Sequence, residues 1–183
     1  MADIVLTPTS PLSGQSTEIA GCTLAERADI ALTSMACPLG GDKAFEKHLT
    51  ARFGVARPDP RISSVKGQAR AVSMSPDQVL VLHEASQTAE PNAAAYQTDQ
   101  TGNWCVIELT GPRATEALRR VCPLDLADSV FAVDGSARTV MEHMGAVVIK
   151  TAPQSFLLLS ASSSALSFWH AIEQSLKNID GDV

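Results

Sequence analysis

Residues 109–126, LTGPRATEALRRVCPLDL, predict the end of a strand, a tight turn and an amphipathic helix. The helix places apolar residues at i, i+3, i+4 and i+7, which predicts one buried stripe of Ala114, Ala117, Leu118 and Val121. Pro112 belongs near the helix start, where its missing N–H costs nothing, and Pro123 ends the helix. The strand before the turn, 104–109, alternates between two faces. One face carries Cys105, Ile107 and Leu109. The stretch therefore predicts a strand–turn–helix corner.

Two features of this corner are candidates for chemistry. The Thr-Gly-Pro turn at 110–112 precedes a helix, and the free N–H groups of a helix start can bind a phosphate. The sequence lacks the further glycines of a dinucleotide site and the Gly-Lys-Ser/Thr of a P-loop, so a capped turn is the favoured interpretation. Cys122 is expected at a helix C-terminus, where the helix dipole disfavours a thiolate. Arg119 and Arg120 are expected on the outer face. Cys122 is therefore expected to be a buried structural cysteine.

Before the corner, apolar spacing and turn residues predict further elements. Residues 28–32 alternate as a half-buried strand, and a helix at 42–53 is expected to be capped by Asp42 and ended by Gly54. A hairpin of 68–74 and 79–82 is expected around a type I turn.

After the corner, the sequence predicts a three-stranded antiparallel meander with turns at Gly145 and 152–154. Its strands are 137–143, 146–150 and 155–160. A last helix is expected at 163–179. Its expected buried face comprises Leu166, Trp169, Ile172, Leu176 and Ile179.

The expected order indicates an α+β fold, with mainly antiparallel sheet covered on one face by helices. Residues 1–18 are rich in Thr, Ser, Pro and Gly and predict an extended N-terminal arm, so that the α+β domain covers 19–183. The order strand–helix–strand–strand recurs in two halves, 19–83 and 101–183. Polar, Ala-rich residues 84–100 are expected to be a surface connection between them.

Composition narrows the class of function. The formal charge is −6 and no Lys/Arg cluster is present, which argues against nucleic acid and anionic membranes as partners. The N-terminal residues lack the basic region and apolar run of a signal peptide, and the longest apolar runs are too short to cross a bilayer. A soluble cytoplasmic protein is therefore expected. The cysteines have no CxxC spacing, so reduced thiols are expected in place of disulfides or a zinc site. They are Cys22, Cys37, Cys105 and Cys122.

No local set of residues predicts catalysis. The histidines are scattered, and none has a neighbouring Ser or carboxylate that makes a triad visible: His48, His83, His143 and His170. Met141 and Met144 suit core filling or an interface contact, and 162–164 suits a helix cap. Three carboxylates could gather in space, although no local pattern places them together: Glu108, Asp125 and Asp128. The residues thus assign no catalytic, cofactor-binding or metal site, which favours a binding or assembly role.

Five pieces of the sequence, in order, resemble the gamma subunit of heterotetrameric sarcosine oxidase. The most specific is TDQTGNWCVIELTGPRATEALRRVCPLDL at 98–126. The other four are LTPTSPLSG (6–14), FGVARP (53–58), SPDQVLVL (75–82) and SFWHAIEQSL (167–176). Gln78 and Val79 replace the Glu and Trp of the family's hairpin, and 100–103 departs from its Ser-Xaa-Gly-Arg. These departures leave sarcosine and other N-methyl compounds open as the substrate of the parent enzyme.

The resemblance implies a complex of four different subunits that oxidatively demethylates sarcosine to glycine and produces hydrogen peroxide. The methyl carbon would leave as formaldehyde, or as methylene-tetrahydrofolate when folate is present. The resemblance places FAD on the beta subunit, FMN between alpha and beta, NAD on alpha, zinc on delta, and tetrahydrofolate away from this chain. The partners of this chain would then be the alpha, beta and delta subunits. The chain itself would be non-catalytic and serve assembly, with a fold similar to the folate-binding domain of aminomethyltransferases.

Two alternatives stay open. The first is the equivalent subunit of a related N-methyl amine or N-methylglutamate dehydrogenase or oxidase. The second is a folate-binding, aminomethyltransferase-like protein. The second is ranked lower because the connection 84–100 carries only Glu84, Glu90 and Asp99 as acids, with no clear set of residues to fix a pterin.

Overall fold

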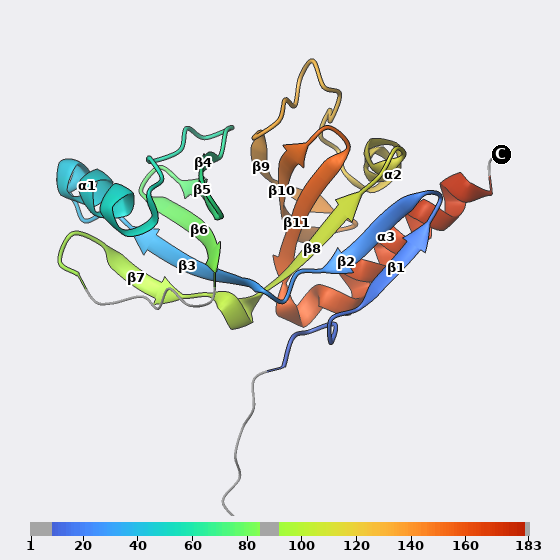
Figure 1. Cartoon of the computed structure of the whole chain (residues 1–183), viewed down its shortest axis with the longest axis horizontal. Helices are drawn as coiled ribbons and strands as arrows, with labels where there is room; N and C mark the ends of the chain where they lie inside the picture. The colour runs from blue at the N-terminus through green and yellow to red at the C-terminus, as the bar shows by residue number, and fades with distance from the viewer. Residues whose placement is uncertain (1–8, 85–91, 182–183) are drawn as a thin grey trace, which may run out of the picture.

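The computed structural model describes residues 9–84 and 92–181, which form two antiparallel sheets with helices packed on them (Figure 1). One sheet has the strand order β1-β2-β8-β11-β10-β9, and the other has the order β4-β5-β6-β3-β7. All the recorded strand pairs are antiparallel. The predicted α+β class is therefore confirmed.

The bounds of the elements show that the larger sheet draws on both ends of the chain. It comprises β1 (Ser16–Ile19), β2 (Cys22–Glu26), β8 (Trp104–Thr110), β9 (Ser136–Met141), β10 (Met144–Ala152) and β11 (Ser155–Ala161). The smaller sheet comprises β3 (Ile30–Ala36), β4 (Ser64–Lys66), β5 (Ala69–Ser75), β6 (Gln78–Glu84) and β7 (Tyr96–Asp99). The helices are α1 (Asp42–Phe53), α2 (Ala114–Val121) and α3 (Ala165–Asp180), with short 3-10 turns η1 (Thr101–Asn103) and η2 (Ser162–Ser164).

Three apolar layers hold the elements together. The largest joins α2 and α3 to the outer face of the six-stranded sheet, and includes Trp169 and Phe168. A second joins α1 to the outer face of the five-stranded sheet through Phe45 and Leu49. The third lies between the sheets, where Leu80 of one shares a cluster with residues such as Leu159 of the other. Each sheet is thus covered on one face by helices and on the other by its neighbouring sheet.

The central strands of the six-stranded sheet are apolar on both faces, because one face meets helices and the other meets the second sheet. In β8, Cys105, Ile107 and Leu109 join the helix-side core, whereas Val106 joins the layer between the sheets. This confirms the two faces predicted for 104–109. The same burial on both faces explains why residues 156–159 of β11 are all apolar. Phe156 and Leu158 join the helix-side core, whereas Leu157 and Leu159 join the layer between the sheets.

Several sequence-based expectations are confirmed. Helix α1 has the predicted bounds, and Gly54 follows it with φ 74°, so that its N–H bonds the carbonyl of Thr50. The hairpin β5–β6 turns at residues 76–77. The three-stranded meander β9–β10–β11 is antiparallel throughout. Arg119 and Arg120 are exposed, as expected for the outer face of α2.

Other expectations are wrong in detail. Asp42 is the first residue of α1 and makes no side-chain cap, because its carboxylate instead accepts from Arg57 Nη1 at 2.7 Å. The turn expected at Gly145 lies at Glu142 and His143, which take φ values of 46° and 67°, and Gly145 lies within β10. Leu166 is 57% exposed because it lies at the start of α3, beyond the edge of the buried stripe.

Strand boundaries also differ at two places. Residues 28–29 form a turn that the Ile30 N–H closes by bonding the Arg27 carbonyl at 3.4 Å, and β3 then runs from Ile30 to Ala36. The predicted connection 84–100 contains β7, which pairs with β3 as an edge strand of the smaller sheet. Residues 85–91 of that connection lie outside the described residues.

Within the predicted arm 1–18, residues 1–8 also lie outside the described part. Leu12 is buried in the helix-side core of the six-stranded sheet, and β1 pairs with β2. Among the helices that the structure describes, none has both the length and the apolar character needed to cross a membrane.

Candidate functional site

The strand–turn–helix corner at 109–126 is a packing feature. Gly111 follows β8 with φ 131°, a conformation that L side chains rarely adopt. A Cβ atom there would lie 2.6 Å from the Gly21 carbonyl oxygen and 2.7 Å from the Cys22 Cα. The turn therefore needs glycine so that it can approach the β1–β2 hairpin. Helix α2 begins two residues after Pro112, at Ala114, and no capping side chain bonds its first turn.

Helix α2 packs against α3 through its buried face. Ala114, Ala117 and Leu118 are buried, and Ser175 of α3 donates its hydroxyl to the Ala117 carbonyl at 2.7 Å. Val121 is partly buried against the same core. The predicted buried stripe is confirmed, and the corner is tied from both sides into the largest apolar layer.

Cys122 is buried, and its burial raises the pKa of the thiol. A raised pKa keeps the sulfur protonated near neutral pH and makes it a poor nucleophile. Burial likewise raises the pKa of Cys22, and it raises that of Cys105 to about 12, with the nearby carboxylate of Glu26 adding to the effect. Burial and the Asp42 carboxylate raise the pKa of Cys37. All four cysteines are free thiols. None of these environments favours a thiolate.

His83 is the most buried of the histidines and is already engaged on both ring nitrogens. Its Nδ1 lies 2.8 Å from the Glu84 carbonyl oxygen, which can only accept, so Nδ1 carries the proton. Nε2 then accepts from the Thr33 hydroxyl at 2.8 Å. Burial lowers the pKa of His83 and favours this neutral form. The ring also packs 5.0 Å from that of Phe53.

The remaining histidines lie apart from one another. His143 occupies the β9–β10 turn and His170 the exposed side of α3, whereas His48 accepts from the Gln97 side-chain amide at 2.9 Å. The serines of η2 include Ser162, whose hydroxyl donates to the Gly102 carbonyl at 2.7 Å. Met141 is in the core and Met144 packs against it, as the sequence predicts.

The three carboxylates considered together in the sequence have separate partners. Glu108 accepts from Arg27, Asp125 accepts from the Ala127 N–H, and Asp128 accepts from Lys150. In the part of the chain that the structure describes, no group of three His, Cys, Asp or Glu residues is placed to hold a metal ion.

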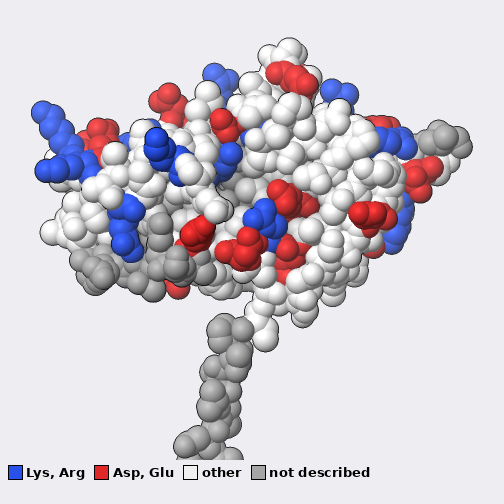
Figure 2. Space-filling view, viewed as in Figure 1, with Lys and Arg blue, Asp and Glu red and all other residues white. Residues whose placement is uncertain are grey.

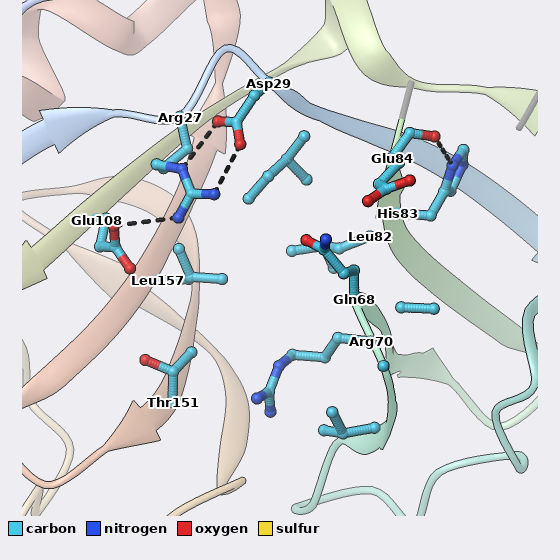
Figure 3. A pocket seen from close by; sticks show the side chains of 14 residues that line it. Arg27, Asp29, Gln68, Arg70, Leu82, His83, Glu84, Glu108, Thr151 and Leu157 are labelled. Carbon is cyan, nitrogen blue, oxygen red and sulfur yellow. Dashed lines mark hydrogen bonds and ion pairs between the residues drawn. The ribbon is translucent and has the colours of Figure 1, made fainter. Parts of the chain in front are cut away.

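Several charged side chains lie along the seam between the two sheets. A cleft of about 200 Å³ opens there, lined from one side by Glu108, Thr151 and Leu157 and from the other by Arg70 and Leu82 (Figure 3). Arg27 lies at its rim and pairs with both carboxylate oxygens of Asp29, at 2.8 and 2.7 Å, and with Glu108 at 3.1 Å. These bonds raise the pKa of Arg27 and lower that of Asp29.

Arg70 ties the far end of the seam. Its Nη1 donates to Asp134 Oδ1 at 2.7 Å and to the Ser63 hydroxyl at 2.5 Å. The Ser63 N–H donates to the Asp134 carbonyl at 2.7 Å, and Ile62 forms an isolated bridge with Gly135. These hydrogen bonds connect the loop before β9 to the loop before β4. The two sheets are therefore joined by hydrogen bonds as well as by apolar contact.

Lys150 of β10 holds the loop before β9 through its buried ammonium group. Its side chain is 1% exposed, and its ammonium donates to Asp128 and, at 3.0 Å, to the Phe131 carbonyl. The ammonium also lies 5.6 Å from the centre of the Phe156 ring. A buried cation needs such partners. This lysine therefore helps to order the segment between α2 and β9.

A larger cavity of about 750 Å³ lies beside the seam, where the N-terminal segment meets β3, β7 and β8. Its size suits a small ligand. The charged groups in its walls are already engaged: Glu26 with the N-terminal segment, Arg27 with Asp29 and Glu108, and Asp99 with the Thr101 N–H. An occupant of the cavity would therefore meet apolar surface and charged groups that are already paired.

Charges of both signs mix on one face of the molecule. On the face in Figure 2, Lys/Arg and Asp/Glu side chains are interspersed over both sheets.

The sequence named Glu108 as a candidate carboxylate but predicted none of the ion pairs of the seam. Arg27 and Glu108 lie 81 positions apart, and Arg70 and Asp134 lie 64 apart. No local spacing signals such pairs. Only the strand order, which brings β2, β8 and the loop before β9 together with the smaller sheet, places them in contact.

No family model matches the chain. A 107-residue segment is 31% identical to the sarcosine oxidase subunit gamma of Corynebacterium sp. (strain P-1), and covers 55% of this chain and 52% of that protein. A 121-residue segment is 30% identical to the sarcosine oxidase subunit gamma of Arthrobacter sp, and covers 61% and 59%. The matched segments thus span little more than half the length of these curated relatives.

Solved structures share the fold over nearly the whole chain. A chain of the heterotetrameric sarcosine oxidase from Corynebacterium sp. U-96, in complex with pyrrole 2-carboxylate, superposes with a TM-score of 0.78 at 21% identity. That match covers 94% of this chain and 96% of the other. The aminomethyltransferase T of the glycine cleavage system from Bartonella henselae superposes with a TM-score of 0.60 at 8% identity, over 90% of this chain and 56% of that one. The resemblance to the gamma subunit and the similarity to the aminomethyltransferase fold, both predicted from the sequence, are confirmed.

Proposed function

We propose that this chain is the gamma subunit of a heterotetrameric sarcosine oxidase and serves the assembly of that enzyme without taking part in its chemistry. The observation that supports this most strongly is the fold match to a chain of such an oxidase, which extends over 94% of this chain and 96% of the other. The two curated relatives named as gamma subunits add sequence similarity to the shared fold.

The state of the reactive side chains supports the proposed non-catalytic role. The thiols of Cys22, Cys37, Cys105 and Cys122 have raised pKa values. His83 uses both ring nitrogens within the fold. The charged residues of the seam are paired: Arg27 with Glu108 beside β2 and β8 of the larger sheet, and Arg70 of the smaller sheet with Asp134 before β9. Reactive side chains that are buried as protonated thiols or already paired suit a scaffold more than a reaction centre.

The complex would oxidatively demethylate sarcosine to glycine in the cytoplasm, with hydrogen peroxide and either formaldehyde or methylene-tetrahydrofolate as further products. Its alpha, beta and delta subunits would be the partners of this chain and would hold FAD, FMN, NAD, zinc and tetrahydrofolate. The N-terminal arm would contribute to the contact. Removal of residues 1–8 is then expected to weaken co-purification and to leave the melting temperature of the isolated chain unchanged.

Co-purification tests the proposal. The tagged chain, co-expressed with the three neighbouring reading frames, is expected to recover three further subunits and flavin absorbance. The chain expressed alone is expected to be colourless. A flavin bound stoichiometrically to the isolated chain, or a failure to recover any flavoprotein, would contradict the proposal.

The parent enzyme could instead be a related N-methyl amine or N-methylglutamate dehydrogenase or oxidase, because Gln78 and Val79 depart from the family's hairpin. Assays of the assembled complex against a panel of N-methyl substrates, with oxygen and artificial acceptors, distinguish these enzymes. A folate-binding role is suggested by the aminomethyltransferase-like fold. It predicts that tetrahydrofolate raises the melting temperature of the isolated chain.

A further inference from the structure

The buried carboxylate of Glu26 organises the segment that precedes β1. Glu26 ends β2 and is 9% exposed. Its Oε2 accepts from the Ser10 hydroxyl at 2.9 Å and from the Gly14 N–H at 2.7 Å, and its Oε1 accepts from the Leu12 N–H at 3.1 Å. The Cys105 thiol also points to Oε1, at 3.9 Å. Both carboxylate oxygens are therefore committed to holding residues 10–14, which we call the strap.

The strap forms a turn in which the Leu12 and Gly14 N–H groups converge on the Glu26 carboxylate. Ser13 and Gly14 take φ values of 54° and 73°, and the Ser13 N–H bonds the Ser10 carbonyl at 3.2 Å. Backbone N–H groups that converge in such turns form a concave site for an anion. Here the anion is part of the same chain. A non-glycine residue in this conformation costs free energy, so the Ser13 backbone is held in place by its surroundings.

The strap is anchored at its other face by Leu12, which is 7% exposed and belongs to the helix-side core. Ser10 and Pro11 of the strap, with Thr9 before it, form one wall of the 750 Å³ cavity. Trp104 and Val106 line another wall. In Figure 1 the segment, in dark blue, passes below the junction of the two sheets. Residues that close this cavity therefore depend on the Glu26 carboxylate for their position.

We propose that the Glu26 carboxylate acts as a clasp: by holding the strap, it keeps the cavity of about 750 Å³ beside the seam closed. Loss of this clasp opens that cavity while both sheets stay folded. The cavity walls lie on β3, β7 and β8, whose pairing does not involve the strap. The strap can therefore separate from Glu26 without breaking a strand ladder. The inference concerns the isolated chain and does not depend on the proposed function.

Glu26→Gln is the variant that tests the clasp. It keeps the shape of the side chain but turns one acceptor oxygen into an NH₂ group that faces the strap's N–H or O–H donors. Hydrogen exchange at the Leu12 and Gly14 amides, measured by NMR on the full chain, is expected to be at least about tenfold faster than in the wild type. Glu18→Gln is the matched control, because Glu18 is an exposed carboxylate of the adjacent strand β1.

Tryptophan fluorescence reports the opening of the cavity itself. Of the two tryptophans, Trp104 lines the cavity and Trp169 is 0% exposed in the core. Acrylamide quenching is expected to increase in Glu26→Gln but not in Glu18→Gln, and the increase is expected to vanish in a Trp104→Phe background. Ser10→Ala, which removes one donor, is expected to give a smaller change of the same kind.

Three results would overturn the proposal. One is unchanged exchange at Leu12 and Gly14 in Glu26→Gln. Another is faster exchange with no change in Trp104 quenching, since the strap would then move without opening the cavity. The third is loss of the cooperative unfolding transition in both Glu26→Gln and Ser10→Ala, which would make the clasp a requirement for the fold.

Discussion

The corner at 109–126 carries several local sequence motifs, whereas the seam between the sheets carries none. The corner contains a glycine turn, a helix start and a cysteine, all of which resemble parts of an active site. In the structure these residues are packed, with Gly111 against the β1–β2 hairpin and Cys122 in the core. The seam has no motif, yet it holds the ion pairs of Arg27 and Arg70. A conspicuous local pattern thus marks a demand of packing here, whereas the polar contacts that join the sheets depend on topology.

Gly111→Ala tests the corner and has the largest expected effect. The new Cβ would lie within 2.7 Å of two backbone atoms, the Gly21 oxygen and the Cys22 Cα, and the residue would keep an unfavourable φ. We expect the free energy of unfolding to fall by about 3 kcal/mol or more. Chemical denaturation of the purified chain measures this change.

Gly145→Ala is the control for that variant. Gly145 lies in β10, and a Cβ atom there would have no heavy atom within 4 Å. Its effect on the free energy of unfolding should stay within about 0.5 kcal/mol. Equal losses in the two variants would show that the corner has no special need for glycine.

Arg70→Gln tests the seam. Its side chain is 13% exposed, and it holds Asp134 of the other sheet's loop together with Ser63. We expect a loss of about 1–2 kcal/mol in the free energy of unfolding. A double-mutant cycle with Asp134→Asn should give a coupling energy clearly above zero. Arg61→Gln, which changes an exposed arginine in the neighbouring loop, should have little effect. Zero coupling would mean that apolar contact alone joins the sheets.

His83→Gln sharpens the comparison through pH. Burial lowers the pKa of His83 in the folded chain, so below about pH 6.5 the unfolded state binds a proton that the folded state does not. The stability due to neutral His83 is therefore complete above that pH and falls as the pH drops toward the folded-state pKa. The slope is at most about 1.4 kcal/mol per pH unit.

Urea unfolding at pH 7.5 and pH 5.5 measures this effect. The loss between the two values should be smaller by about 1 kcal/mol in His83→Gln than in the wild type. His170→Gln, which changes an exposed histidine of α3, should lose as much as the wild type. Identical losses in His83→Gln and the wild type would show that another group controls the acid sensitivity.

The sequence predicts the parts of the fold that rest on local rules. The period of apolar residues predicted α1, α2, α3 and the meander, and Gly54 ended α1 as expected. Where a side chain had a better long-range partner, local reasoning failed. Asp42 bonds Arg57 instead of capping its helix. Strand β7 was missed because YQTD carries no apolar alternation, and only its pairing with β3 makes it a strand.

The candidate site shows the same division. The sequence predicted a buried Cys122 from its place at a helix C-terminus, and it predicted exposed arginines in α2 from helix periodicity; both predictions are confirmed. It could not find the Glu26 clasp, since Ser10, Leu12 and Gly14 are read as a turn-rich arm until β2 is seen beside them. It also missed Lys150, whose neighbours in β10 predict only an apolar strand.

The proposed function has this chain supply structure and no chemistry to an oxidase complex. The most direct measurement is sarcosine-dependent peroxide production by the complex assembled with Cys122→Ala, normalised to assembled complex by flavin absorbance. The account predicts the same kcat as with the wild-type chain, because the Cys122 thiol is a protonated core group. A fall in kcat of about tenfold or more in a fully assembled complex would place this corner in the reaction and contradict the account.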